Sequence, residues 1–212
     1  MSDIKVVRII AGELETNTYI CAKGDRCFLV DPTGDVAKLN KKIADEGLQI
    51  DGVLLTHGHF DHCMLAKYFQ NLGIKIYIHT LDADKLYSDK NLASMCGVSF
   101  QSLNADVLLN DGDVLNIANI EVKVMLTQGH SVGSVCYVVD EGNCIFVGDL
   151  LFKLSYGRTD FFDGNFNALA ESCRRVFSLT KNYILYTGHG DITKLEYERK
   201  CNIINVDARG VL

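Results

Sequence analysis

The chain has 212 residues, of which 48% are hydrophobic and 23% are charged, and its formal net charge at pH 7 is -6. This composition supplies enough apolar side chains for a sizeable core, and the acidic balance disfavours nucleic acid or an anionic membrane surface as a partner. Because the sequence has neither a signal-peptide pattern nor an apolar run of the roughly 18 to 20 residues that span a bilayer, we expect a cytoplasmic protein with one domain over residues 1–212.

The predicted elements of the first half are strands and helices in alternation. In chain order they are strands within 8–32 with a turn at 23–26, a helix over 35–46, a buried strand over 51–56, a helix over 61–72 and a strand over 74–79. Residues 88–105 show no readable periodicity.

Strands dominate the second half. The pattern predicts strands within 106–117, 120–127 and 134–149, a helix over 166–179, a strand over 182–187 and a short helix over 193–203. Two sheet-rich halves that each include helices favour an α/β (α+β) layered domain, with the helices on the outer faces of the sheets.

The stretch "THGHFDH", residues 56–62, contains three of the six histidines of the chain. His57 and His59 directly follow a predicted strand, and alternate residues of an extended segment project to one side. Asp61 and His62 fall where the next helix is predicted to begin. One strand–loop–helix joint therefore presents four candidate metal ligands, and we reject the alternative that Asp61 is only a helix cap beside exposed histidines.

Three further candidate ligands follow predicted strands in the same way. His130, Asp149 and His189 each come after an apolar strand and a glycine, in "QGH", "VGD" and "TGH". Glycine lets the backbone turn sharply and approach a site closely. The shared position at strand ends indicates one common site. The sixth histidine, His79, has no glycine or partner cluster and is predicted to be structural.

Seven ligands exceed what one tetrahedral ion uses, but they suit two ions about 3.5–4 Å apart. In this hypothesis one ion takes His57, His59 and His130, the other takes Asp61, His62 and His189, and Asp149 bridges them. Imidazole and carboxylate ligands suit Zn²⁺, Fe or Mn²⁺, with Zn²⁺ as our first choice. The eight cysteines form no CxxC pair and are predicted to be small buried hydrophobes.

The set "HGHFDH", "GHS", "GD" and "GHG" resembles the metallo-β-lactamase superfamily, and "YGRTDF" at 156–161 resembles its glyoxalase II-like hydrolases. The resemblance covers nearly the whole chain. It implies a four-layer αβ/βα sandwich of two mixed sheets with a binuclear site at one sheet edge. Only 23 residues follow His189, too few for the added helical domain that helps glyoxalase II hold glutathione, so the chain resembles the one-domain bacterial members.

The resemblance implies a metal-dependent hydrolase that cleaves a thioester, such as a hydroxyacylglutathione or a related small acyl thioester, by a metal-bound hydroxide. Asp61 would coordinate a metal and orient the hydroxide. Arg158 would either hold a substrate carboxylate or form a structural ion pair. The expected partner is a small-molecule substrate, and we expect a monomer or a small homo-oligomer.

Two alternatives to thioester hydrolysis remain open at this point. One is a persulfide dioxygenase-like oxidoreductase with a single iron held by His57, His130 and Asp149. The other is a lactonase or a phosphodiesterase of the same superfamily, because one scaffold hosts several reactions.

Overall fold

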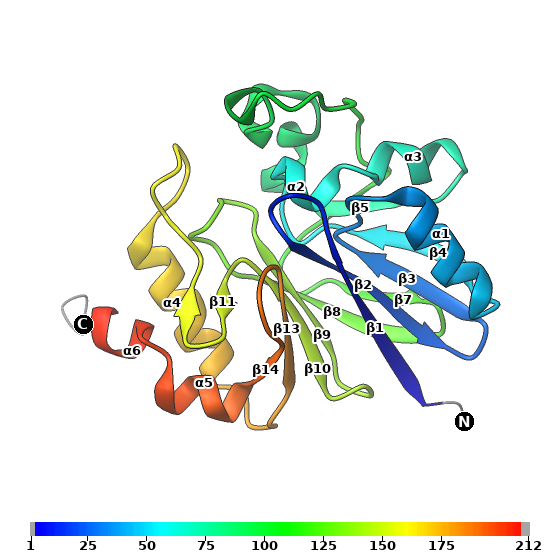
Figure 1. The fold of residues 1–212 in the computed structure, drawn as a ribbon. Helices are drawn as coiled ribbons and strands as arrows, with labels where there is room; N and C mark the ends of the chain where they lie inside the picture. The colour runs from blue at the N-terminus through cyan, green and yellow to red at the C-terminus, as the bar shows by residue number, and fades with distance from the viewer. Residues whose placement is uncertain (1–2, 209–212) are drawn as a thin grey trace.

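The structure is a computed structural model that describes residues 3–208, and its strands form two packed sheets (Figure 1). Within these residues the first sheet has six strands in the order β1 (Ile4–Ala11), β2 (Thr16–Lys23), β3 (Arg26–Val30), β4 (Gln49–Leu54), β5 (Ile76–His79) and β6 (Val107–Leu109). The strands β1, β2 and β3 pair antiparallel, whereas β3 to β6 pair parallel.

The second sheet lies against the first and also has six described strands. Its order is β14 (Thr193–Lys194), β13 (Ile184–Thr187), β10 (Cys144–Gly148), β9 (Val135–Val139), β8 (Ile120–Leu126) and β7 (Val114–Ile117). Only the β10–β13 pair among these is parallel. A short hairpin of β11 (Leu151–Phe152) and β12 (Ser155–Tyr156) follows β10.

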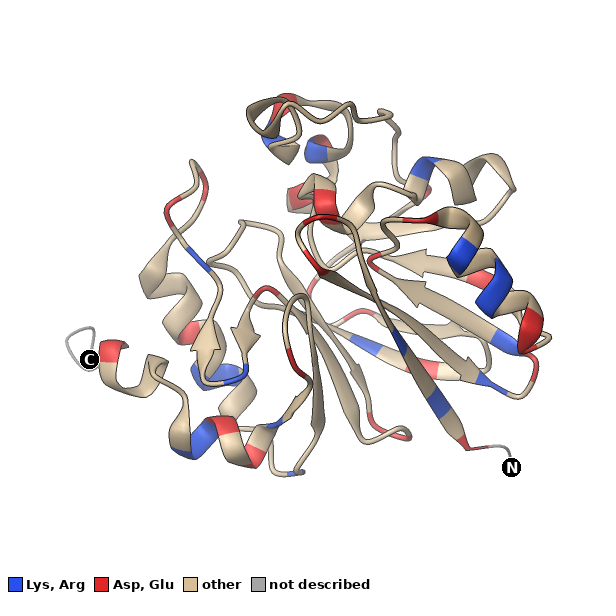
Figure 2. Ribbon diagram, in the orientation of Figure 1, with Lys and Arg blue, Asp and Glu red and all other residues tan. Residues whose placement is uncertain are grey.

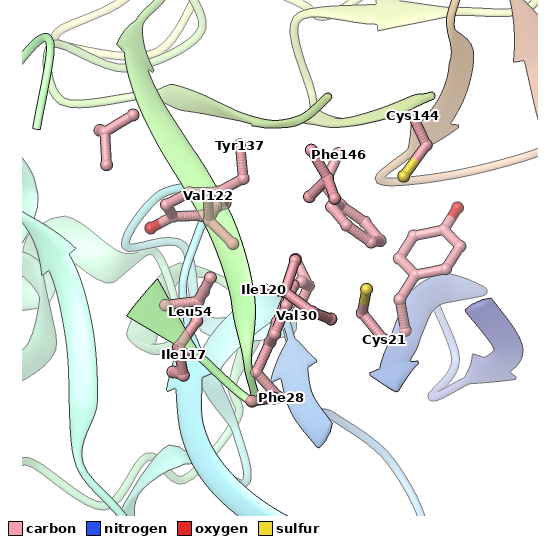
Figure 3. Close-up of a cluster of buried hydrophobic side chains, with 14 of the residues drawn as sticks. Cys21, Phe28, Val30, Leu54, Ile117, Ile120, Val122, Tyr137, Cys144 and Phe146 are labelled. Atoms are coloured by element: carbon pink, nitrogen blue, oxygen red, sulfur yellow. The ribbon is translucent and has the colours of Figure 1, made fainter. Parts of the chain in front are cut away.

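The main core fills the space between the two sheets (Figure 3). Phe28 of the first sheet packs against Phe146 of the second, with ring centroids 6.0 Å apart. The buried tyrosines also link the sheets, because Tyr137 Oη donates to the Leu55 carbonyl at 2.7 Å and Tyr19 Oη donates to the Thr187 carbonyl at 2.7 Å. Each tyrosine hydroxyl is hydrogen-bonded and each ring is buried, so the two tyrosines connect the sheets without leaving a polar group unpaired.

Helices cover the outer face of each sheet. α1 (Val36–Asp45) and α3 (Ala66–Asn71) pack on the first sheet through buried residues such as Leu39 and Phe69. α4 (Phe166–Phe177), α5 (Leu195–Cys201) and α6 (Ile204–Asp207) cover the second sheet through an apolar layer that includes Leu169 and Val176. Because helices lie outside both packed sheets, the predicted four-layer αβ/βα sandwich is confirmed. Lys and Arg residues lie along α1, α5 and β1 (Figure 2).

Two predicted elements differ from the structure. The helix expected over 61–72 is divided into α2 (Phe60–Cys63) and α3, because the Leu65 amide donates to the Pro32 carbonyl at 3.0 Å. The final segment expected as one helix over 193–203 begins with the short strand β14 before α5.

The unreadable segment contains 3-10 helices, which have no long apolar period. Within 88–105 they are η2 (Asp89–Asn91) and η3 (Ser94–Cys96), and a further 3-10 helix, η1 (Thr80–Tyr87), directly precedes the segment. Among the described residues, no helix has the length and apolar character that crossing a membrane requires.

Candidate metal centre

The candidate ligands lie at one edge of the sandwich, where several strands end. His57 and His59 follow β4, and Asp61 and His62 lie in α2. The others follow strands of the second sheet: His130 after β8, Asp149 after β10 and His189 after β13. Gly129 and Gly148 precede two of these ligands with φ of 134° and 50°, a region that favours glycine. The structure thus brings all seven predicted ligands to one place.

The ligand atoms form two groups, and a third set of His57, His62 and Asp149 links them. His57, His59 and His130 offer nitrogens within 4.8 Å of one another, and His59 Nδ1 lies 2.9 Å from His130 Nε2. In the second group, Asp61 Oδ2 lies 3.4 Å from His62 Nε2 and 3.3 Å from His189 Nε2. These are the residues of the two predicted ligand groups, and their division between two ions stays a prediction.

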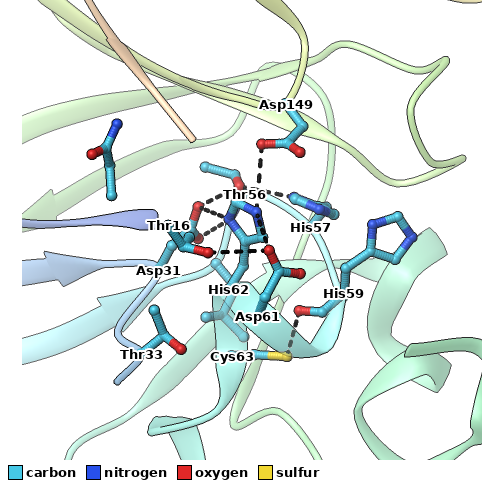
Figure 4. A network of polar contacts seen from close by, with 12 residues as sticks. Thr16, Asp31, Thr33, Thr56, His57, His59, Asp61, His62, Cys63 and Asp149 are labelled. Atoms are coloured by element: carbon cyan, nitrogen blue, oxygen red, sulfur yellow. Dashed lines mark hydrogen bonds and ion pairs between the residues drawn. The ribbon is translucent and has the colours of Figure 1, made fainter. Parts of the chain in front are cut away.

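The Asp149 carboxylate lies between the two groups. Its Oδ1 is 3.4 Å from His62 Nε2, whereas its Oδ2 is 3.6 Å from His130 Nε2 and 3.5 Å from His189 Nε2. Figure 4 shows Asp149 facing Asp61 and His62 across the site. One carboxylate therefore contacts ligand atoms of both groups, which is the position that a bridging ligand takes.

The site fits metal ions because it contains buried polar atoms without protein partners. Nε2 of His57 and His62 and Oδ1 of Asp149 have no hydrogen-bond partner among the described residues. Leaving one such atom unpaired costs about 1–3 kcal/mol. Imidazole nitrogens and carboxylates are suitable ligands for Zn²⁺, Fe and Mn²⁺, so bound ions would satisfy these atoms.

The electrostatics of the cluster also favour cations. Burial, together with the neighbouring His62, lowers the pKa of His57 well below its usual value. Burial opposes protonation of His62 as well, but the carboxylates of Asp61, Asp149 and Asp31 outweigh it and raise the pKa of His62 to about 10. Without an ion, the carboxylates thus hold a proton on His62. A metal ion can replace that proton, because metal ligands bind in their deprotonated form.

Asp31 fixes the orientation of His62. It follows β3, and its carboxylate accepts hydrogen bonds from the Thr56 amide at 2.8 Å and the Thr56 hydroxyl at 2.6 Å. Its Oδ2 also lies 2.9 Å from His62 Nδ1, so Nδ1 carries the hydrogen and the Nε2 lone pair is free for a metal. Asp31 was not predicted as a site residue, although it follows a buried strand in "FLVDP" as the predicted ligands do.

Backbone carbonyls orient two other imidazoles. His130 Nδ1 donates to the Arg158 carbonyl at 2.9 Å, and His189 Nδ1 donates to the Leu14 carbonyl at 2.9 Å. A carbonyl can only accept a hydrogen bond, so each Nδ1 carries the hydrogen and each Nε2 is left as the available ligand atom. The loops that carry Leu14 and Arg158 therefore help to shape the centre.

Asp82 connects the loop that contains Gly58 to the loop that contains Ser131 and Gly133. It was not predicted as a site residue. Its buried carboxylate accepts from the Gly58 amide at 2.8 Å, the Gly133 amide at 2.7 Å and the Ser131 hydroxyl at 2.8 Å. Lys85, also buried, donates to it at 2.7 Å. A Cβ on Gly133 would lie 2.5 Å from the Asp82 amide nitrogen, so this close approach requires glycine.

Lys85 also reaches the loop that follows β12. Its Nζ donates to Asp163 Oδ2 at 2.5 Å, and the Val132 amide donates to the same oxygen at 3.3 Å. Lys85 contacts both Asp82 and Asp163. Its buried ammonium group therefore links the Asp82 carboxylate, which holds the loops of Gly58 and Gly133, to residues 157–165. No periodic signal could reveal these charged residues in a segment of 3-10 helices.

Arg158 lies on the surface beside the centre. Its guanidinium pairs with Asp160 through two hydrogen bonds of 2.6 Å and stacks over the Phe161 ring at 4.4 Å, and its side chain is 61% exposed. The ion pair that the sequence analysis considered is therefore present. A role in holding a substrate carboxylate stays a prediction.

The remaining histidine and the cysteines are separate from the ligand groups. His79 is buried, and its Nδ1 accepts a hydrogen bond from the Leu81 amide at 3.2 Å, which is a structural role at the start of η1. All eight cysteines are free. Six of them are buried and two, Cys96 and Cys201, are exposed.

Two packed sheets with outer helices and a cluster of histidines and aspartates at their common edge define a candidate metalloprotein. The chain belongs to the Metallo-beta-lactamase superfamily, whose sequence model matches residues 11–189.

Relatives of similar length support this membership. The chain is 32% identical to the "Probable metallo-hydrolase YqgX" of Bacillus subtilis over 200 residues, which cover 92% of this chain and 94% of the relative. It is 29% identical to the "Hydroxyacylglutathione hydrolase GloC" of Haemophilus influenzae over 184 residues, which cover 82% of this chain and 84% of the relative.

Solved structures resemble the fold closely. The BLEG-1 B3 metallo-beta-lactamase superposes with a TM-score of 0.90 at 31% identity and covers 93% of this chain and 98% of its own. TTHA1623 in a di-iron-bound form superposes with a TM-score of 0.84 at 32% identity and covers 92% of this chain and 98% of its own.

Proposed function

We propose that this protein hydrolyses a small acyl thioester with two divalent metal ions, Zn²⁺ being the first choice and Fe the alternative. The position of the Asp149 carboxylate between two ligand groups carries the proposal, because it is suited to a two-ion centre. The similarity to a hydroxyacylglutathione hydrolase supports the substrate class, and the di-iron form of TTHA1623 keeps iron as a candidate.

Each of the two ligand groups would hold one ion, as predicted from the sequence. His57, His59 and His130 would hold one ion, and Asp61, His62 and His189 would hold the other. Bound ions would supply a nucleophilic water at neutral pH and would polarise the substrate carbonyl.

Asp61 is the proposed catalytic residue for orienting the attacking water. Burial alone would raise the pKa of Asp61, but His62 and His189 lower it below its ordinary value, so the carboxylate is ionised at neutral pH. The Thr16 hydroxyl donates to Asp61 Oδ2 at 3.1 Å and restricts its orientation. An ionised and restrained carboxylate can accept a hydrogen bond from the water and so orient the water oxygen toward the carbonyl carbon of the substrate.

The reaction needs no further acid. The water oxygen forms a C–O bond to the acyl carbon, the C–S bond breaks with its electron pair on sulfur, and the protons of the water balance the products as carboxylate, thiol and one free proton. An ordinary thiol has a pKa of about 8.5, so a thiolate leaves without protonation in advance. Arg158, exposed above Phe161, is the proposed contact for a carboxylate on the thiol part of the substrate.

A substrate panel with metal analysis tests this proposal. The purified, metal-loaded protein is assayed with a thioester, a lactone and a phosphodiester, and oxygen consumption is measured with glutathione persulfide. We expect two ions per chain and the thioester as the best substrate. Oxygen uptake with one iron per chain would instead establish the dioxygenase alternative.

A further inference from the structure

A pocket of about 390 Å³ opens beside Asp61, between the loop that joins β1 and β2, helix α2 and residues 96–98. We propose that this pocket binds an apolar, uncharged acyl chain of the substrate. The inference rests on the proposed thioester hydrolysis and narrows its substrate class.

The walls of this acyl pocket are mainly hydrophobic. They include side chains from three separate parts of the chain: Leu14, Phe60, Met64, Leu65 and Val98. Phe60 is held in place by the buried residues Leu92 and Ala93, so one wall of the pocket is preformed. Leu14 is 52% exposed, and an alkyl chain would remove its surface from water.

The charged groups that line the pocket are acidic. They are Glu13 and Asp61, and the described lining contains no Lys or Arg. Lysine and arginine residues lie elsewhere, along α1, α5 and β1 (Figure 2). A negatively charged acyl group would lose its hydration beside two carboxylates without gaining a cation, so the lining disfavours it.

The pocket is continuous with the candidate centre. Asp61 and Thr16 both line it, and the Thr16 hydroxyl donates a hydrogen bond to Asp61 Oδ2 at 3.1 Å. The same carboxylate lies 3.3 Å from His189 Nε2. A chain that fills the pocket therefore ends next to the ligand groups, where the carbonyl of a thioester has to lie.

A series of N-acetylcysteamine thioesters tests the preference with the metal-loaded protein. Each buried methylene contributes about 0.8 kcal/mol, which corresponds to about a fourfold gain in kcat/KM. We expect kcat/KM to rise by about this factor per methylene from acetyl to hexanoyl, mainly through KM. The adipoyl thioester, which ends in a carboxylate at the same chain length, should be at least about tenfold poorer than hexanoyl.

Two matched variants locate the effect. Leu14→Glu adds a carboxylate to the pocket wall and should abolish most of the gain from acetyl to hexanoyl. Leu72→Glu makes the same change at a residue outside the pocket that is 60% exposed, and should leave the gain intact. Equal effects of the two substitutions would overturn the assignment of the chain to this pocket.

A binding measurement keeps the inference separate from catalysis. The S-hexyl thioether of N-acetylcysteamine cannot be hydrolysed, and the two exposed cysteines report where it binds. Cys96 lines the pocket, whereas Cys201 lies in α5. We expect the thioether to slow alkylation of Cys96 by N-ethylmaleimide, measured by peptide mass spectrometry, and to leave Cys201 unchanged.

The outcomes distinguish the two proposals. If thioesters are cleaved but the rate is flat with chain length or favours adipoyl, the acyl pocket is wrong and the proposed function stands. If no thioester is cleaved but Cys96 is protected, the proposed function is wrong and the pocket still binds apolar chains. Equal alkylation of Cys96 with and without the thioether overturns the pocket.

Discussion

Asp31 lies directly behind His62, and its Oδ2 accepts a hydrogen bond from His62 Nδ1 at 2.9 Å. Both side chains are buried, and the Thr56 amide and hydroxyl hold the carboxylate in place. This contact leaves His62 Nε2 facing Asp61 and Asp149. The geometry of the second ligand group therefore depends on a residue that lies outside the ligand groups.

We expect Asp31→Asn to weaken metal binding at one of the two positions. Residues that orient a metal-bound histidine typically contribute 10–100-fold to affinity. The second ion, at Asp61, His62 and His189, should bind about 10–100-fold more weakly, and the first should change less, in a titration against a competing chelator. Asp35→Asn, an exposed helix cap for which asparagine is equally suitable, is the control. Equal weakening of both positions would contradict the assigned role.

The buried Lys85–Asp82 pair should contribute strongly to stability. Removing one partner of a buried ion pair costs about 3–5 kcal/mol, whereas an exposed pair contributes about 1 kcal/mol or less. We expect Lys85→Met to lower the free energy of unfolding by the larger amount in urea titrations. Lys41→Met, which removes an exposed i,i+4 pair with Asp45, is the matched control. Similar small losses for both variants would show that Lys85 has no special role.

The metal-free protein should lose stability as the pH rises from about 6.5 to about 10. The carboxylates around His62 raise its pKa to about 10 in the folded state, against about 6.5 when unfolded, so the folded state binds the additional proton in this range. The stabilisation is complete below pH 6.5 and is lost above pH 10. Urea titrations at several pH values should show this slope in the metal-free protein and a much smaller slope in metal-free His62→Gln. An identical slope in both would assign the effect to other groups.

His59→Ala should lower kcat/KM by more than about a hundredfold, since loss of an orienting partner alone costs 10–100-fold. The fold should remain, because the polar contact of the His59 side chain is with His130, another candidate ligand, and not with the apolar core. Circular dichroism and the steady-state thioester assay measure both points. His79→Gln changes a strand-end histidine outside the ligand groups and should keep most of the activity. Unchanged turnover in His59→Ala would contradict the two-ion assignment.

The sequence could single out the seven residues that the structure brings together because most of them share one local signal. His57, His130, Asp149 and His189 all follow apolar strands, and strands that run the same way end at the same edge of a layered fold. Asp31 had the same signal, but a single aspartate before a proline is also a common turn residue. The sequence alone therefore could not distinguish its role from a turn.

Tertiary contacts decide the parts that the sequence could not predict. The apolar period over 61–72 favours one helix, but the Pro32 carbonyl accepts the Leu65 amide and ends α2 early. Asp82 and Lys85 are buried charges in a 3-10 segment, and charged residues are ordinarily expected at the surface. Their role depends on loops far away in the sequence, which no local pattern reports.

The number of ions that each chain binds tests the central claim most directly. The protein is saturated with Zn²⁺ or, without oxygen, with Fe²⁺, freed of unbound metal and analysed by inductively coupled plasma mass spectrometry against its concentration. We predict two ions per chain, and one in His189→Ala, which removes a ligand from the second group only. A single ion in the saturated wild-type chain would contradict a centre built around a bridging Asp149.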